Sequence, residues 1–325
     1  MTDGVIERIT RITHTTHTTQ RRVIIQRVAG AVAVLWAAVT VTFIALQLIP
    51  GDIAAIMAGQ SSYEGLEDAI RKEWNLDQPW HVQYFHYVAR VFTGDFGRSY
   101  VKREDVSVIL GQSIGPTIQL ALAAGLLAVV SAIVVSLLTA GRNGPLRSFF
   151  IGFELLVNSI PVFWSGLVLL IAFSVKIQLF PISGADGLVS LVLPAIVLAL
   201  PTFGLLSQVL REAMERSLEQ PFALTALSRG ISPLRLRTHH ALRHGLVPAV
   251  TLAGWLIGHL LGGAVITETV FSRPGLGTTT LQAVLGKDVP VVFAVVLIVA
   301  LVYVVTSALV DISYSIIDPR TKGSS

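Results

Sequence analysis

Residues 118–140 read IQLALAAGLLAVVSAIVVSLLTA and contain no charged side chain. The hydrocarbon core of a bilayer is about 30 Å thick, and a helix needs about 20 mostly apolar residues to cross it. Five further stretches of about 20 or more mostly apolar residues occur, at 29–49, 150–175, 188–210, 246–267 and 291–317. The pattern predicts an all-α integral membrane protein with six transmembrane helices. Pro194 and Pro201 fall inside the fourth stretch, which we expect to be kinked and packed among the other helices.

The composition agrees with a membrane protein and excludes other classes. Apolar residues make up 53% of the 325 residues and charged residues 14%, and the mean hydropathy is +0.70. Soluble domains carry about 25% charged residues. The absence of cysteine excludes disulfide scaffolds and thiolate metal sites. A Walker phosphate loop, an H-E-x-x-H zinc motif and a G-x-S-x-G nucleophile elbow are also missing, so we expect no catalysis and no metal site.

The positions of Lys and Arg predict the orientation in the membrane. With a cytoplasmic N-terminus, 15 of the 24 Lys and Arg residues fall on inner segments, including six Arg between 211 and 243. Positive residues favour the cytoplasmic side, so both termini should be cytoplasmic. The net charge of +4 is then a property of inner loops and gives no reason to expect nucleic-acid binding.

The chain divides into four parts. Residues 1–22 form a Thr-rich cytoplasmic leader, 23–112 the first transmembrane helix with an extracytoplasmic subdomain, 113–317 a five-helix transmembrane domain, and 318–325 a cytoplasmic tail. The outer stretch 50–112 carries nine acidic residues and an aromatic cluster, and we expect it to fold as short helices on the outer face of the membrane. Its aromatic residues are interpreted as interfacial anchors or, alternatively, as a ligand cage.

Several residues inside the apolar stretches are candidates for function. Glu154, Glu268 and Asp311 are ionisable groups in or near transmembrane segments, where they mark either a pairing partner or a transport pathway. Residues 268–277 are expected to form a turn-rich external loop. A stripe of glycines predicts close helix packing, either inside one subunit or across a subunit interface; it comprises Gly254, Gly258 and Gly262. The nearby histidines at 239, 240 and 244 are interpreted as a polar helix surface rather than a metal site, because arginines lie among them.

The inner stretch 211–245 is long for an idle connection. It predicts a helix that ends near Leu218, a break at Gln220-Pro221, a short helix over about 222–229 with a stop at Gly230, and a basic helix that re-enters the membrane near Pro248. A short helix held between two transmembrane segments indicates a docking element surrounded by the six Arg. A solvated basic loop is the alternative.

The motifs of this chain resemble those of a known family. Residues 226–230 (ALSRG) and 240–248 (HALRHGLVP) are similar to the EAA loop of permease subunits in binding-protein-dependent ABC importers of the dipeptide/oligopeptide family. Further matches are LIPGD at 48–52, LDQP at 76–79, GDFG at 94–97, ETVF at 268–271, PGLG at 274–277 and DPR at 318–320, with Asp311. The LIPGD motif and the large loop after it are similar to the B-type permease.

The resemblance implies a type I importer permease with the MetI-like fold in the cell membrane of a prokaryote. It implies a coupling helix that docks on the ATPase. This helix would be formed by Leu224, Thr225, Ala226, Leu227, Ser228, Arg229 and Gly230. His240, Leu242 and Arg243 would support this loop, and Gly254, Gly258, Gly262 and Glu268 would lie near the translocation path. Leu224 and Thr225 replace the Glu and Ala of the general motif, and Arg243 replaces a Pro.

The implied partners are a second, C-type permease, two ABC ATPase subunits that bind ATP and Mg, and an extracytoplasmic peptide-binding protein. The implied function is ATP-driven import of dipeptides or oligopeptides by alternating access, without a cofactor on this chain. Within the same family, nickel, glutathione or another small solute is an alternative substrate. A self-sufficient proton-coupled carrier that uses Glu154, Glu268 or Asp311 is the alternative from another class, and an intramembrane enzyme is disfavoured by the missing motifs.

Overall fold

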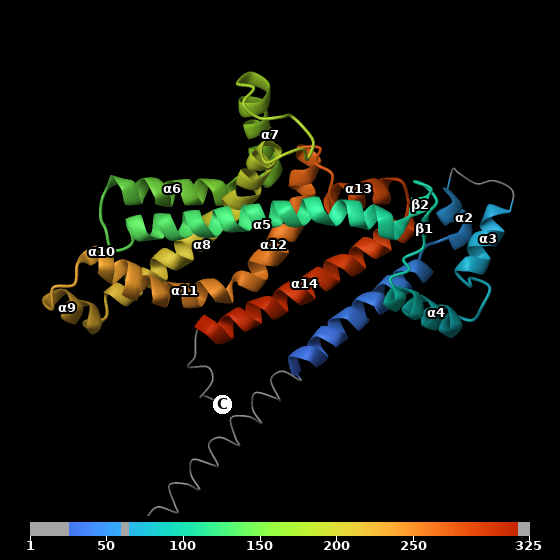
Figure 1. The fold of residues 1–325 in the computed structure, drawn as a ribbon, viewed down its shortest axis with the longest axis horizontal. Coiled ribbons are helices and arrows are strands. Elements are labelled where there is room, and N and C mark those ends of the chain that lie inside the picture. The colour runs from blue at the N-terminus through green and yellow to red at the C-terminus, as the bar shows by residue number, and fades with distance from the viewer. Residues whose placement is uncertain (1–25, 60–64, 318–325) are drawn as a thin grey trace, which may run out of the picture.

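The structure is a computed structural model that describes residues 26–59 and 65–317 (Figure 1). The expected leader at 1–22 and tail at 318–325 lie outside these residues. For Gly254 and Asp311 the structure describes the helical backbone but not the surroundings. Within the described ranges every regular element is helical except one short β-hairpin.

The first helix, Gln26–Gln47, is followed by an outer group of short elements. These are α2 (Ile53–Ala58), α3 (Leu66–Glu73), α4 (Trp80–Thr93) and the antiparallel strands β1 (Arg98–Ser99) and β2 (Glu104–Asp105). The next elements are α5 (Val106–Thr139), α6 (Pro145–Ser159), α7 (Val162–Leu169), the π-helical η2 (Leu170–Lys176) and α8 (Val189–Leu218). The last are α9 (Pro221–Ser228), α10 (Pro233–Arg235), the π-helical η3 (Leu236–Ala241), α11 (Leu242–Thr251), α12 (Ala253–Val270), α13 (Leu276–Leu285) and α14 (Val289–Ile317).

Four helices are long and apolar enough to cross a membrane, and two bent pairs bring the number to as many as six in the described part. The apolar segment expected at 150–175 is helical but broken, because α6 and the α7–η2 segment meet at 107°. Pro161 explains the break, since a proline lacks the backbone N–H and forces the preceding residue to be extended. Ile160 has φ −89° and ψ 128°. The expected helix at 246–267 is also bent, by 61° between α11 and α12.

The second transmembrane helix begins earlier than the sequence suggests. Helix α5 starts at Val106 and continues through Pro116 without a break, so residue 112, the expected end of the extracytoplasmic subdomain, falls inside it. Its 34 residues span about 51 Å at 1.5 Å per residue. That length exceeds a bilayer core of about 30 Å, so part of α5 extends beyond the hydrocarbon region.

Helix α8 is the central element of the transmembrane part. It runs through Pro194 and Pro201 without a break, and 61% of its most apolar window is buried, the largest share among the four long helices. It packs against α5, α6, α11 and α12. Two glycines permit close approach: an added Cβ at Gly204 would lie 2.9 Å from Val157 of α6, and one at Gly245 of α11 would lie 3.0 Å from Met214. The expectation of a packed fourth helix is confirmed.

The outer group folds mainly as short helices, as expected, and it shares a core with the first helix and α14. Trp74, directly after α3, and Tyr87 of α4 are each 7% exposed and pack with Phe43 of the first helix and Leu297 of α14. Trp80, Phe85 and Phe92 remain exposed. The aromatic cluster therefore supplies both core residues and surface residues. Figure 1 shows α2, α3 and α4 at the end of the molecule opposite to α9.

An ion pair is buried between α6 and α8. Glu154 is fully buried and Arg211 is 6% exposed. Arg211 donates from Nη1 to Oε1 of Glu154 at 2.7 Å and from Nη2 to Oε2, and Ser207 Oγ donates to Oε1 at 2.6 Å. Of the two roles open for Glu154, the structure supports pairing. It also corrects the view that all six inner Arg surround the cytoplasmic loop, because Arg211 lies inside the bundle.

Replacing Glu154 with Gln should lower the free energy of unfolding by about 3–5 kcal/mol, because it leaves the Arg211 charge buried without a counter-charge. The double variant Glu154→Met with Arg211→Met should be less destabilised than this single variant. Thermal unfolding of the detergent-solubilised chain measures both effects.

Arg216 provides the matched control. It pairs with Glu212 at 3.5 Å on the surface, with side chains 67% and 68% exposed, and exposed pairs contribute about 0–1 kcal/mol. Arg216→Met should therefore leave the unfolding temperature nearly unchanged. Equal effects of Glu154→Gln and Arg216→Met would contradict the importance of the buried pair.

Candidate functional site

The short helix α9 projects from the end of the bundle (Figure 1). Pro221 occupies its first turn, where a missing N–H costs nothing. Ala223 is buried at 2% exposure and anchors one face of α9, whereas Leu224 and Leu227 are 72% and 42% exposed. Among the other predicted docking residues, Ala226 is half-buried. The exposed ones are Thr225, Ser228, Arg229 and Gly230. The helix therefore presents an apolar and polar surface that no other described residue covers.

Helix α9 ends in a Schellman motif. Gly230 has φ +81°, a left-handed conformation that favours glycine. The N–H of Ile231 donates to the carbonyl of Ala226 at 3.1 Å, and the N–H of Gly230 donates to that of Leu227 at 3.0 Å. The structure confirms the predicted break at Gln220-Pro221, the short helix after it and the helix end at Gly230.

The residues expected to support this loop have different surroundings. The ring of Phe222 contacts the rings of His240 and His244, with centroids 6.5 and 5.8 Å apart. Leu242 packs against a small core made of Ala140, Met214 and Ala241, whereas Arg243 is exposed. Of the expected supporting residues, His240 thus contacts α9 through Phe222, and Leu242 packs on the core beside the loop. In the described ranges, no group of three His or acidic residues is placed to hold a metal ion.

Glu268 organises the junction of three helices. It is fully buried near the end of α12, and it accepts hydrogen bonds from Thr117 Oγ1 of α5 at 2.5 Å and from the backbone N–H groups of Gly277 and Thr278 at 2.8 and 3.3 Å. A carboxylate at the start of α13 compensates N–H groups that have no partner within the helix. The expected loop at 268–277 is corrected, because its two ends belong to α12 and α13.

Two glycines of the PGLG motif are required by this close packing. An added Cβ at Gly275 would lie 2.3 Å from Oε1 of Glu268, and one at Gly277 would lie 2.4 Å from the Cα of Val265. Neither position has room for a side chain. Glu268 was expected near the translocation path, and the structure places its carboxylate in a buried cluster of hydrogen bonds.

Two glycines of α12 have an open environment. An added Cβ at Gly258 or Gly262 would meet no atom of this chain within 4 Å, whereas one at Gly263 would lie 2.7 Å from Leu198. Trp255 and Ile266 are exposed on the same face, at 53% and 43%. Packing inside one subunit is therefore wrong for Gly258 and Gly262, and packing across a subunit interface stays a prediction.

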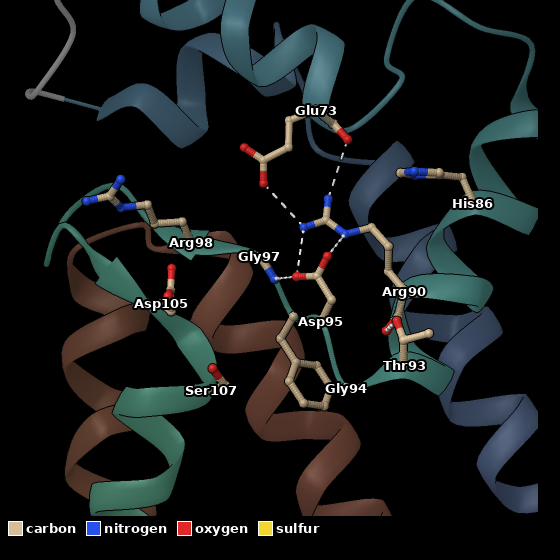
Figure 2. A pocket seen from close by; sticks show the side chains of 11 residues that line it. Glu73, His86, Arg90, Thr93, Gly94, Asp95, Gly97, Arg98, Asp105 and Ser107 are labelled. Carbon is tan, nitrogen blue, oxygen red and sulfur yellow. Dashed lines mark hydrogen bonds and ion pairs between the residues drawn. The ribbon is translucent and has the colours of Figure 1, made fainter.

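A polar cavity of about 590 Å³ lies in the outer subdomain (Figure 2). Arg90 of α4 is held over the ring of Trp74, with its guanidinium carbon 4.7 Å from the ring centroid. It pairs with Asp95 at 2.9 Å and with Glu73 at 3.2 Å. The hydrogen bond from Arg90 lowers the pKa of the Asp95 carboxyl, although partial burial opposes this. Strands β1 and β2 form the opposite wall with Arg98 and Asp105.

The sequence singled out Glu154 and Glu268 but not the partners that they bind, and it singled out neither Glu73 nor Arg90. Glu73 and Arg90 lie 17 positions apart, Glu154 and Arg211 lie 57 apart, and Thr117 and Glu268 lie 151 apart. No local spacing connects partners at such separations. The GDFG motif at 94–97 was the one available signal for the outer cavity, since its Asp95 binds Arg90.

Substituting Gly277 with Ala should lower the stability of the isolated chain by about 1–3 kcal/mol, because the new methyl group overlaps the backbone of α12. Gly258→Ala is the matched control: it adds the same methyl group into open space and should be neutral or slightly stabilising, since Ala favours helix. Thermal unfolding in detergent tests the pair, and equal loss in both variants would contradict the packing described for α13.

Comparisons with known proteins agree with this geometry. The family described as binding-protein-dependent transport system inner membrane component matches residues 128–323, and the N-terminal family of the same transport systems matches residues 20–121. A Brucella abortus protein named as a peptide transport system permease is 35% identical over 92% of this chain and 98% of its own length. A Sinorhizobium fredii protein named as a peptide ABC transporter permease is 32% identical over the same shares.

A glutathione transport system permease protein of Salmonella choleraesuis is 32% identical over 92% of this chain and 98% of its own length. Among solved structures, the MetNI methionine ABC transporter matches with a TM-score of 0.54 and 17% identity, over 65% of this chain and 96% of the other. This likeness shows the MetI-like permease fold. The chain therefore belongs to the binding-protein-dependent ABC importer family, as a multi-pass inner-membrane permease that is not catalytic, binds no cofactor itself, and works with ATPase and binding-protein partners.

Proposed function

We propose that this permease imports dipeptides or oligopeptides, which a peptide-binding protein delivers on the outer side. A second, C-type permease completes the pathway, and two ATPase subunits drive alternating access between an outward-open and an inward-open state. A ligand or nucleotide shifts such an equilibrium only through different contacts in the two states. ATP supplies these contacts at the ATPase pair, and the permease converts them into movement of its helices.

The substrate class is supported by relatives that align along nearly the whole chain. The Brucella abortus and Sinorhizobium fredii relatives are named for peptide transport, and the Salmonella choleraesuis relative is named for glutathione transport. Glutathione is itself a small peptide, so the two names share a backbone chemistry. Nickel is less well supported, because the described residues contain no group of metal ligands.

The ATPase-docking role of residues 224–230 is supported by one observation above all: α9 is fixed on its inner side and uncovered on its outer side. Ala223 and the Phe222 ring contacts hold the helix, and Leu224 remains 72% exposed. An exposed apolar side chain on a short, rigid helix is typical of a docking contact. The Arg-rich segment around it agrees with a cytoplasmic location, and both termini are proposed to lie on the same side.

The open glycine face of α12 supports a second permease next to this chain. Gly258 and Gly262 are uncovered here, and small residues allow helices from two subunits to approach closely. We assign this face to the subunit interface near the translocation path. Glu268, which joins α12 to α13, would act there as a structural support.

Leu224→Asp should reduce recovery of the ATPase with the permease by at least about tenfold, since a central apolar contact is worth about 2 kcal/mol. Uptake into vesicles should fall in parallel. Leu234→Asp is the matched control, because Leu234 is 63% exposed on α10, outside residues 224–230. Normal ATPase recovery and uptake with Leu224→Asp, or with residues 224–230 deleted, would refute docking through α9.

Reconstituted transporter should accumulate a labelled dipeptide only when both ATP and the binding protein are present. An ATPase partner that lacks its Walker lysine is the control and should abolish uptake. Uptake of labelled glutathione or of Ni²⁺, without any dipeptide uptake, would favour the alternative substrates. Uptake that persists without ATPase and collapses with the proton gradient would favour the proton-coupled carrier.

A further inference from the structure

The β-hairpin of the outer subdomain is joined to the transmembrane helices by a buried polar contact. Ser99 of β1 is fully buried, and Asp288, between α13 and α14, is 3% exposed. Ser99 Oγ donates to Oδ2 of Asp288 at 2.5 Å across 189 positions of sequence, and it accepts from the backbone N–H of Lys102 at 2.9 Å. A second contact on the same side joins Lys102 Nζ to Gln282 Oε1 of α13 at 3.4 Å.

This contact is costly to break. Oδ1 of Asp288 is buried without a hydrogen-bond partner, and within the described residues Ser99 is the one side chain that hydrogen-bonds this carboxylate. Removing Ser99 would leave the buried carboxylate with only the backbone N–H of Val291 and the charge of Lys102 to compensate it. The loss of one partner from a buried carboxylate carries a free-energy penalty. The hairpin and the α13–α14 junction are therefore expected to stay together when either one moves.

Helix α13 is held at both ends. At its start, Gly277 and Thr278 donate to Glu268 of α12. At its end, Gln282 and the following Asp288 contact the hairpin. In addition, Ser113 of α5 hydrogen-bonds Thr279 at 2.8 Å. A displacement of the hairpin thus has a direct path through α13 to α12.

The other side of the hairpin faces the outer cavity (Figure 2). Arg98 and Asp105 line one wall of this cavity, and Glu73 and Arg90 of α3 and α4 line the other. A partner protein that binds the outer subdomain can therefore displace the β-hairpin, which Ser99 attaches to α13.

We propose that Ser99 and Asp288 are positioning residues for transport, which couple the extracytoplasmic subdomain to α13 so that arrival of the binding protein is transmitted to α12. This inference rests on the binding-protein dependence of the family and is independent of the peptide substrate and of docking through α9.

The test compares ATP hydrolysis by the complete transporter in nanodiscs, with and without its purified binding protein. Ser99→Ala and Asp288→Ala should lower the stimulation by the binding protein about five- to tenfold, the change expected when one buried hydrogen bond is removed from a two-state coupling. Basal hydrolysis and the affinity for the binding protein should stay unchanged. Asp288→Asn should retain the stimulation, because an amide oxygen still accepts from the Ser99 hydroxyl.

Tyr100→Phe is the matched control. Its hydroxyl donates to Glu73 at 2.8 Å inside the outer subdomain and does not reach α13, so its loss should leave the stimulation intact. Full stimulation in Ser99→Ala, or an equal loss in Tyr100→Phe, would overturn the proposal. Uptake of a labelled peptide by the wild-type transporter is measured separately. A lack of uptake contradicts the proposed substrate, whereas the variants' stimulation of ATP hydrolysis tests the proposed coupling.

A cross-link gives a second measurement that does not depend on a buried substitution. The chain has no cysteine, and Lys102 and Gln282 are both exposed. Lys102→Cys with Gln282→Cys, joined by a flexible bifunctional thiol reagent and verified by mass spectrometry, should retain stimulated hydrolysis, because the two elements move together. Loss of turnover on cross-linking, with normal turnover when only one cysteine is modified, would show that they must separate and would overturn the proposal.

Discussion

The carboxylate of Glu268 is the interaction on which the outer half of the transmembrane part depends. It sits near the end of α12, accepts from Thr117 of α5, and compensates the first N–H groups of α13. Thr117 in turn accepts from the backbone N–H of Leu276 at 2.8 Å. A charge buried at this position is tolerated because each of its oxygens has a donor. The same arrangement forces Gly275 and Gly277 to lack side chains, which explains the PGLG motif in physical terms. Three helices are thereby fixed relative to one another without an ion pair.

In the inner half, a buried carboxylate is compensated by an ion pair instead. Glu154 and Arg211 neutralise each other between α6 and α8, and Ser207 supplies a further donor. Beyond this pair, α8 leads into the segment that carries α9, so the proposed docking helix is attached directly to the most buried of the four long apolar helices. A force applied at α9 is then delivered to α8, which contacts α5, α6, α11 and α12. The two ends of the molecule thus use short elements, α9 inside and the hairpin outside, that are each anchored to long helices.

Sequence reasoning was most successful where the signal is local. Apolar length located the four long apolar helices and the two bent helix pairs that could also cross a membrane, and the series Pro221, Gly230 and Pro233 located the boundaries of the short helix α9. It failed where a residue far away decides the outcome. The early start of α5 at Val106 is one case, because residues 106–110 pack on α13 and α14 rather than on their neighbours in sequence. Arg211 is another: an arginine next to a basic loop is read as part of its surface until its partner on α6 is known.

The sequence by itself determined the class of protein, the positions of the apolar segments and the resemblance to importer permeases, because these follow from apolar run length, the distribution of charge and short contiguous motifs. Only the tertiary structure decided which charges are paired, which glycines are covered and which are open, and which contacts join the outer subdomain to α13. The physical reason is that burial and hydrogen bonding depend on residues brought together from distant parts of the chain, as Ser99 and Asp288 are. Such partners share no periodicity that a linear pattern can reveal.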